Sequence, residues 1–219
     1  MSNRKLGLLH TSATLVPIFE QLCKSKLPGV SVFNLVDDSL IKDVIAHGKL
    51  RPHTARRVAQ HIAAAEDAGA DYIMVTCSSI GAAVEASAPL ASVPVLRVDQ
   101  PMADQAIATA KRIGVIATLP TTLEPTADLL RRRAVAAGKS IELTTRLCEG
   151  AFDALMSGDP NTHDELVKDA LQELASQVDV IALAQASMAR VVAGLAENDQ
   201  CIPILASPPL AVDYLATVL

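Results

Sequence analysis

One cysteine stands where a parallel sheet would present a reactive group. Cys77 follows the apolar run 71–76 and directly precedes Ser78 and Ser79, where a helix over 79–88 is predicted. A thiol at a strand end and a helix start lies near backbone N–H groups and the positive end of the helix dipole, which favours the thiolate. A thiolate can act as a base, as a nucleophile or, once protonated, as an acid. Because cysteine is also one of the residue types most often buried, simple packing is the alternative for Cys77.

The chain carries a second copy of this segment with an amide in place of the thiol. Residues 71–80 align with residues 179–188 at an offset of 108, which sets Gln185 opposite Cys77. Segments on both sides match at nearly the same offset, 6–11 with 113–118 and 93–96 with 202–205. Colinear matches of this kind predict a duplicated domain.

The elements around these segments alternate between strands and helices. Short runs rich in Val, Ile and Leu predict buried strands, and the longer stretches between them predict helices. Strand alternating with helix requires crossover connections, which favours a parallel sheet with helices on both faces. The predicted strands are 5–10, 30–36, 71–76, 93–97, 113–118, 141–147, 179–184 and 202–205, and the predicted helices are 14–26, 39–47, 52–68, 79–88, 101–111, 122–137, 163–177, 186–196 and 209–218.

This pattern predicts an α/β protein with two pseudo-symmetric lobes, each a parallel sheet flanked by helices. Residues 1–99 with the C-terminal helix 209–219 would form the first lobe, and residues 100–208 the second. A length of 219 residues allows two lobes, because about 110 residues is close to the usual size of one domain. The active site is expected in the cleft between the lobes.

The polar residues that follow the predicted strands are the candidate site residues. Ligands of parallel sheets bind at the carboxyl ends of the strands, where loops and helix starts meet. Besides Cys77, these residues are His10, Thr11 and Ser12; Thr76, Ser78 and Ser79; Thr118, Thr121 and Thr122; Glu149; and Gln185, Ala186 and Ser187.

Several of these candidates also have a structural interpretation. His10 titrates in a range suited to proton transfer, but a strand-end histidine is often a structural hydrogen-bonding group. Glu149 would be a general acid if burial raised its pKa, and it would otherwise cap a helix over 150–157. Thr121 and Thr122 begin a predicted helix, a position that serves capping and anion binding alike. Asp37, at the end of another strand, is expected to cap the next helix.

Composition limits the classes of partner. A net charge of −5 without a face dense in Lys or Arg argues against nucleic acid and against an anionic membrane, so we expect a small anionic molecule. The apolar run after Arg4 and Lys5 is too short for a signal peptide or a membrane span, which predicts a cytoplasmic protein. The four cysteines form no C-x-x-C pair, so neither a disulfide framework nor a metal site is expected. No Gly-rich nucleotide motif is present, so no cofactor is expected, and a homo-oligomer is compatible with the sequence.

The duplicated segments around Cys77 and Gln185 resemble the aspartate/glutamate/hydantoin racemase superfamily over essentially the whole chain. The resemblance implies two Rossmann-like lobes, no metal or organic cofactor, and paired cysteines on opposite faces of a small acidic substrate. Cys77 matches the first-lobe cysteine, and Gln185 stands where the second cysteine is expected. The positions that match carboxylate-binding or strand-end polar residues of the family are Thr76, Ser78, His10, Thr11, Ser12, Thr118, Thr121 and Thr122.

We therefore predict a cofactor-independent isomerase or racemase-like enzyme that acts on a small carboxylate or related carbonyl compound through one cysteine. Cys77 would be the reactive thiol, with His10 and Glu149 as further catalytic candidates. Gln185 has no titratable proton, so it would orient a carboxylate or stabilise an enolate oxygen. A decarboxylase or lyase of the same superfamily and a non-catalytic small-acid-binding protein remain open as alternatives.

Overall fold

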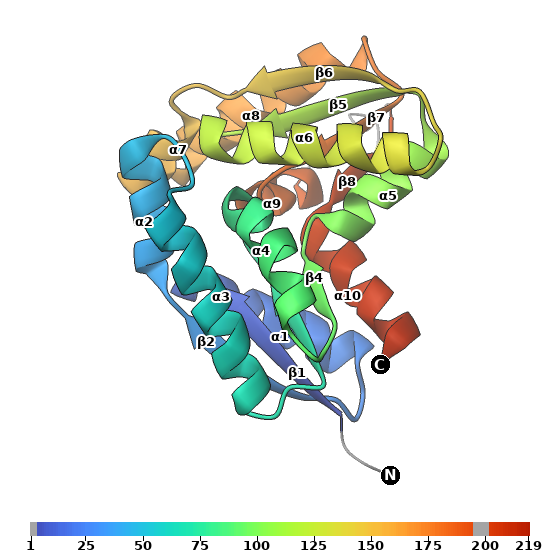
Figure 1. Ribbon diagram of the computed structural model, residues 1–219. Coiled ribbons are helices and arrows are strands. Elements are labelled where there is room, and N and C mark those ends of the chain that lie inside the picture. The colour runs from blue at the N-terminus through green and yellow to red at the C-terminus, as the bar shows by residue number, and fades with distance from the viewer. Residues whose placement is uncertain (1–3, 195–201) are drawn as a thin grey trace. The chain divides into compact units, whose positions relative to one another are not determined.

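The computed structural model describes residues 4–194 and 202–219 (Figure 1). The chain divides into two compact units, Met1–Gln100 with Pro208–Leu219 and Pro101–Ser207. Each unit is built on a four-stranded parallel sheet with helices packed against it. The predicted fold class, an α/β protein with two parallel sheets flanked by helices, is confirmed.

The sheet of the first unit has the strand order β2-β1-β3-β4. Its strands are β2 (Ser31–Val36), β1 (Lys5–His10), β3 (Tyr72–Val75) and β4 (Val95–Arg97). All neighbours are parallel, so the ends of β1, β2 and β3 lie at one edge, followed there by Thr11, Asp37 and Thr76.

Two layers of helices cover this sheet because its side chains alternate in direction. Leu6 and Leu8 of β1 pack with α1 (Val16–Lys26) and with α10 (Ser207–Val218). Leu9 packs on the opposite side among residues of three helices. These helices are α2 (Asp38–His47), α3 (Pro52–Asp67) and α4 (Gly81–Ser87), which Figure 1 shows in blue to green.

The second unit repeats this plan with the strand order β6-β5-β7-β8. Its strands are β6 (Glu142–Leu147), β5 (Arg112–Ala117), β7 (Val180–Leu183) and β8 (Ile204–Ala206). Figure 1 shows α6 on one face of this sheet and α8 on the other. The helices are α5 (Gln100–Thr109), α6 (Pro120–Ala136), α7 (Ala151–Met156), α8 (Pro160–Ala175) and α9 (Ala189–Ala193).

The sequence repeat is reproduced in the backbone hydrogen bonds. The amide of Thr76 donates to the Leu9 carbonyl over 3.0 Å, and in the second unit the amide of Ala184 donates to the Ile116 carbonyl over 3.0 Å. Thr76 and Ala184 directly precede Cys77 and Gln185, so these two residues leave their sheets at equivalent points.

The structure corrects some details of the predicted elements. Strands β2 and β6, each at a sheet edge, are half exposed rather than buried. Predicted helix 79–88 begins with a 3-10 turn, Ser78–Ile80, and the corresponding turn Ala186–Met188 opens predicted helix 186–196. Residues 195 and 196 of that helix, and Cys201, lie outside the described residues. Within the described ranges, no helix is both long and apolar enough to cross a membrane.

Candidate functional site

Cys77 lies directly after β3, at the carboxyl edge of the first sheet, and its side chain is half-buried. The hydroxyls of Thr11 and Ser79 and the backbone N–H groups of Ser79 and Ile80 are placed to donate hydrogen bonds to its sulfur. The turn Ser78–Ile80 brings these two amides back toward the strand end. Cys77 is therefore a thiol with several donors that stabilise its anionic form.

The pKa of Cys77 differs in direction from the sequence-based expectation. Burial raises the pKa of this thiol above its usual value, although the donors from Thr11, Ser79 and Ile80 act in the opposite direction. The expected preference for the thiolate is therefore wrong, because desolvation outweighs the hydrogen bonds. Cys77 rests as a neutral thiol at neutral pH.

The other two described cysteines lie in the cores. Cys23 packs against the first sheet and Cys148 within the second unit, and their side chains are 2% and 4% exposed. Burial raises the pKa of each thiol to about 11. Among the cysteines that the structure describes, Cys77 alone combines partial exposure with hydrogen-bond donors at sulfur.

His10 ends β1 and is fully buried. Its Nδ1 lies 2.9 Å from Thr76 Oγ1, and its Nε2 lies 3.0 Å from Asn34 Oδ1. The Asn34 amide nitrogen donates to Glu20 over 3.1 Å, which turns the Asn34 oxygen toward the ring, so Nε2 carries the hydrogen. Burial lowers the pKa of His10, although Asn34 and Glu20 oppose this effect. Thr76 Oγ1 lies between His10 Nδ1 and the Leu9 carbonyl, to which it donates over 3.2 Å.

This network holds the His10 ring through contacts on both of its nitrogens. Both ring nitrogens are occupied, and the ring contacts Phe19 at a centroid distance of 5.6 Å. His10 holds the Thr76 side chain, the residue before Cys77, and thereby supports the strand end that carries the thiol. Asn34, which anchors this arrangement, was missed by the sequence reasoning, and a polar residue inside the apolar run 30–36 was the available signal.

The remaining first-unit candidates lie at the same edge. Thr11, Thr76, Ser78 and Ser79 are buried, and Ser12 is half-buried with its hydroxyl 2.7 Å from Thr14 Oγ1.

Asp37 caps α2, as predicted, by accepting from the Ser39 amide over 3.1 Å. Its other carboxylate oxygen is paired with Arg57 and His61 of α3, so Asp37 is held by structural contacts.

Gln185 lies after β7, and Thr118 fixes its side chain. Gln185 Oε1 accepts from the Thr118 backbone N–H over 2.5 Å and from Thr118 Oγ1 over 2.9 Å. Because the oxygen is bound in this way, the amide NH₂ is the part of Gln185 that points away from Thr118. An NH₂ group supplies two donors and no acceptor, which suits an anionic oxygen.

Thr121 and Thr122 lie in the first turn of α6. Thr122 is buried, and its backbone N–H donates to Leu119 over 3.1 Å. Thr121 Oγ1 is shielded from solvent and has no hydrogen-bond partner within the described part of the chain. A shielded hydroxyl without a partner costs about 1–3 kcal/mol, so it is a group that a ligand oxygen would satisfy. Ala186 and Ser187 are half-buried in the turn after Gln185.

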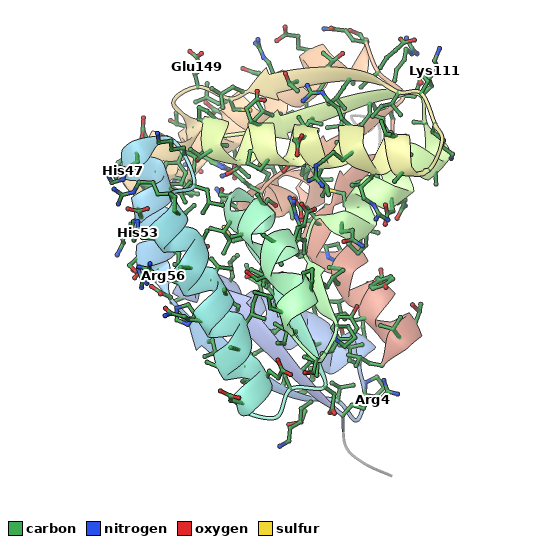
Figure 2. The ribbon with its side chains drawn as sticks, in the orientation of Figure 1. Arg4, His47, His53, Arg56, Lys111 and Glu149 are labelled. Carbon is green, nitrogen blue, oxygen red and sulfur yellow. The ribbon has the colours of Figure 1, made fainter. Side chains whose placement is uncertain are left out.

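Glu149 does not meet the condition for a general acid. That role required burial, but its side chain is exposed in the loop after β6, where Figure 2 labels it. It does not cap the following helix either, since Gly150, with φ of 78°, is the N-cap of α7. Glu149 is therefore removed from the catalytic candidates.

The two strand-end pairs correspond across the repeat. Thr11 contacts Cys77 in the first unit, and Thr118, which aligns with Thr11, contacts Gln185 in the second. A threonine after the first strand of each unit thus orients the residue after the third strand. Among the described residues, no group of three or more His, Cys, Asp or Glu side chains is arranged to hold a metal ion.

Comparison with known proteins identifies the class to which this fold and these strand ends belong. The family model described as Asp/Glu/Hydantoin racemase matches residues 6–215. The chain therefore belongs to the Asp/Glu/hydantoin racemase family, and the predictions of family membership and of an isomerase-class enzyme are confirmed. A search of curated proteins finds no match to this chain.

Solved structures share the fold at low sequence identity. Glutamate racemase from Francisella tularensis, in complex with D-glutamate, is 16% identical with a TM-score of 0.77, over 100% of this chain and 81% of that chain. Aspartate racemase from Picrophilus torridus is 14% identical with a TM-score of 0.73, over 98% and 94%. Allantoin racemase from Klebsiella pneumoniae is 15% identical with a TM-score of 0.71, over 98% and 87%. These structures have the same fold as this protein.

Proposed function

We propose that this protein is a cofactor-independent isomerase that moves a proton at a carbon next to a carboxylate or carbonyl group, with Cys77 as its single proton-transfer group. The observation that carries this proposal is the pair of equivalent strand ends, a thiol with donors at Cys77 and an oriented amide at Gln185. Only the thiol can exchange a proton with carbon.

The reaction step follows from the chemistry of these groups. The Cys77 thiol first loses its proton to solvent, and the thiolate then removes the proton from the substrate carbon, so that the C–H electron pair becomes part of an enolate. The thiol formed in this step then returns a proton to the same face of the enolate: return to the original carbon gives hydrogen exchange, and return to a conjugated carbon, where the substrate offers one, gives the isomer. Negative charge develops on the substrate oxygen in the enolate, and preorganised donors stabilise such charge most effectively. Among the strand-end groups of the second unit, the NH₂ group of Gln185 and Thr121 Oγ1 are donors suited to such an oxygen.

The substrate class follows from the same donors. Each unit has hydroxyls and backbone N–H groups at its strand ends, and the second unit adds the Gln185 amide, which favours a small anion such as an amino acid, a hydroxy acid or a hydantoin. The structurally similar proteins are racemases of glutamate, aspartate and allantoin, so these three compounds are the first to test.

The test is hydrogen exchange at the reacting carbon in deuterium oxide. Wild-type protein is incubated with amino acids, hydroxy acids and hydantoins, and deuterium incorporation is followed by NMR. Cys77→Ser should reduce exchange by about 100- to 10,000-fold, the usual contribution of an acid-base group. Cys148→Ser is the matched control and should leave exchange unchanged.

Other outcomes of the same experiment reject the proposal. Release of carbon dioxide without isomer formation would indicate a lyase. Binding of a compound with no exchange, and with equal affinity in Cys77→Ser, would indicate a binding protein. Full exchange in Cys77→Ser would exclude Cys77 as the proton-transfer group.

A further inference from the structure

A buried ion cluster lies behind the turn that follows Cys77. Arg97, the last residue of β4, is 3% exposed, and its guanidinium binds the fully buried Asp99 through two hydrogen bonds of 3.0 and 2.8 Å. The third nitrogen donates to Glu85 of α4 over 3.1 Å. Arg97 thus ties the end of β4 to α4.

The same guanidinium packs on the backbone at the start of α4. A Cβ placed on Gly81 would overlap Cζ, Nη2 and Nε of Arg97. Gly81 is buried, and its φ of −56° is open to any residue, so close approach of the arginine, not backbone conformation, requires glycine. Arg97 and Gly81 therefore form a fitted contact.

This contact lies one residue beyond the amides that serve the thiol. Ser79 and Ile80 donate their backbone N–H groups to Cys77, and Gly81 is the next residue of the chain. Arg97 also pairs in register with Val75, two residues before Cys77. The arginine holds both the strand that leads into Cys77 and the helix start that follows it.

The second unit provides an internal comparison. Leu183 corresponds to Val75 across the repeat, and its partner in β8 is Ala206 where Val75 has Arg97. The residue that corresponds to Gly81 is Ala189. The unit that carries Gln185 thus has two alanines where the unit with the thiol has the arginine and the glycine.

From these observations we propose that Arg97 and Gly81 are positioning residues for Cys77, which fix the Ser79 and Ile80 amides at the sulfur. This inference rests on the proposed role of Cys77 as the reactive thiol. If Arg97 served only to join β4 and α4, a change in its fit would affect stability but not the sulfur. If it positions the amides, the ionisation and reactivity of Cys77 must change as well, because hydrogen bonds to a thiolate lower its pKa.

The experiment measures the alkylation rate of Cys77 by iodoacetamide from pH 6 to pH 11, quantified by peptide mass spectrometry on the full chain. Gly81→Ala and Arg97→Lys each disturb the contact while leaving a positive charge beside Asp99. Arg97→Met is avoided, because it would leave the Asp99 carboxylate buried without a partner. Each variant should alkylate about 3- to 10-fold more slowly at pH 8, the size expected when a hydrogen bond to the thiolate is weakened. Its rate profile should move to higher pH.

Two control variants separate positioning from a general loss of structure. Ala82→Gly weakens the same helix at an exposed position, and Arg133→Lys alters a bidentate pair with Asp104 in the second unit. Both should keep the wild-type profile. The double variant Gly81→Ala/Arg97→Lys should be less impaired than the sum of the single changes, because the smaller ammonium leaves room for the added methyl group.

Unchanged alkylation profiles in both Gly81→Ala and Arg97→Lys, with melting temperatures that show folded protein, would overturn the inference. If either variant does not fold, Glu85→Gln replaces it. This change removes the negative charge of Glu85, the partner of Arg97 on α4. An unchanged alkylation profile in Glu85→Gln would likewise overturn the inference. Failure of the proposed function is recognised separately, since it appears in the wild type as absence of exchange on every compound.

Discussion

Gln185 and Thr118 form the most fully defined contact at the edge of the second sheet. One amide oxygen accepts both the backbone N–H and the hydroxyl of Thr118, at 2.5 and 2.9 Å. The aligned threonine of the first unit, Thr11, contacts Cys77 through its hydroxyl. The duplication has thus kept the orienting residue while the oriented residue differs, a thiol in one unit and an amide in the other.

Removal of the Thr118 hydroxyl should weaken substrate binding. In Thr118→Val, Gln185 keeps only the backbone hydrogen bond, so its NH₂ group is less firmly oriented. We expect KM to rise about 3- to 10-fold, the effect of one lost hydrogen bond, with a smaller change in kcat. Steady-state kinetics on an identified substrate measures this change. Thr145→Val, at an exposed position of β6 in the same sheet, is the control, and an equal effect in both variants would contradict the role of Thr118.

Cys77 should be the most reactive of the described cysteines. Its side chain is half-buried and has donors at sulfur, whereas Cys23 and Cys148 are buried and the pKa of each is about 11. Iodoacetamide should therefore label Cys77 first at every pH. Because burial raises the pKa of Cys77 above its ordinary value of 9.0, its labelling rate should still be increasing at pH 9. Equal labelling of Cys23 or Cys148 in folded protein, or a plateau below pH 8, would contradict this prediction.

His10 should make stability depend on pH in the mildly acidic range. Burial lowers the pKa of His10 below its ordinary value of 6.5, so the unfolded chain binds this proton at a higher pH than the folded protein does. The contribution is fully present above pH 6.5 and is lost as the pH falls from 6.5 toward the lowered pKa. Urea unfolding should show a free energy of unfolding that decreases in this range, with a smaller decrease in His10→Gln.

Urea unfolding across pH also separates the contribution of His10 to stability from the contributions of acidic groups, because the two are lost in different pH ranges. Interactions with Ser39, His61 and Arg57 outweigh burial and lower the pKa of Asp37 below its ordinary value of 3.8. Its contribution is therefore lost only as the pH falls below that value. Parallel pH profiles of wild type and His10→Gln between pH 5 and 7 would contradict the assignment to His10.

Local sequence signals predicted the strands and their ends. The central part of the run 71–76, Tyr72–Val75, is apolar and buried, and a strand end followed by a polar residue is visible without a structure. The predicted first residues of the helices were less accurate than the predicted strands. The predicted helix 163–177 begins at Pro160, because Asp159 caps it and proline is well suited to the first helical position.

Contacts between distant elements could not be predicted in this way. The His10–Asn34 hydrogen bond joins residues on neighbouring strands, and the fit of Arg97 onto Gly81 depends on how α4 packs beside β4. The direction of the Cys77 pKa shift was missed for the same reason. Helix-start amides can be inferred from position in the chain, whereas burial is a property of the packed structure.

The stereochemistry of exchange tests the central claim, that Cys77 is the single proton-transfer group and Gln185 a binding group. Single enantiomers of aspartate, glutamate and hydantoins are incubated in deuterium oxide with wild-type protein and with Gln185→Cys, and the products are separated by chiral chromatography with mass detection. The account predicts that the wild type incorporates deuterium with retained configuration and racemises very slowly. Gln185→Cys should gain racemisation, since a second acid-base group contributes about 100- to 10,000-fold. Rapid racemisation by the wild type, with deuterium in the inverted product, would contradict the claim.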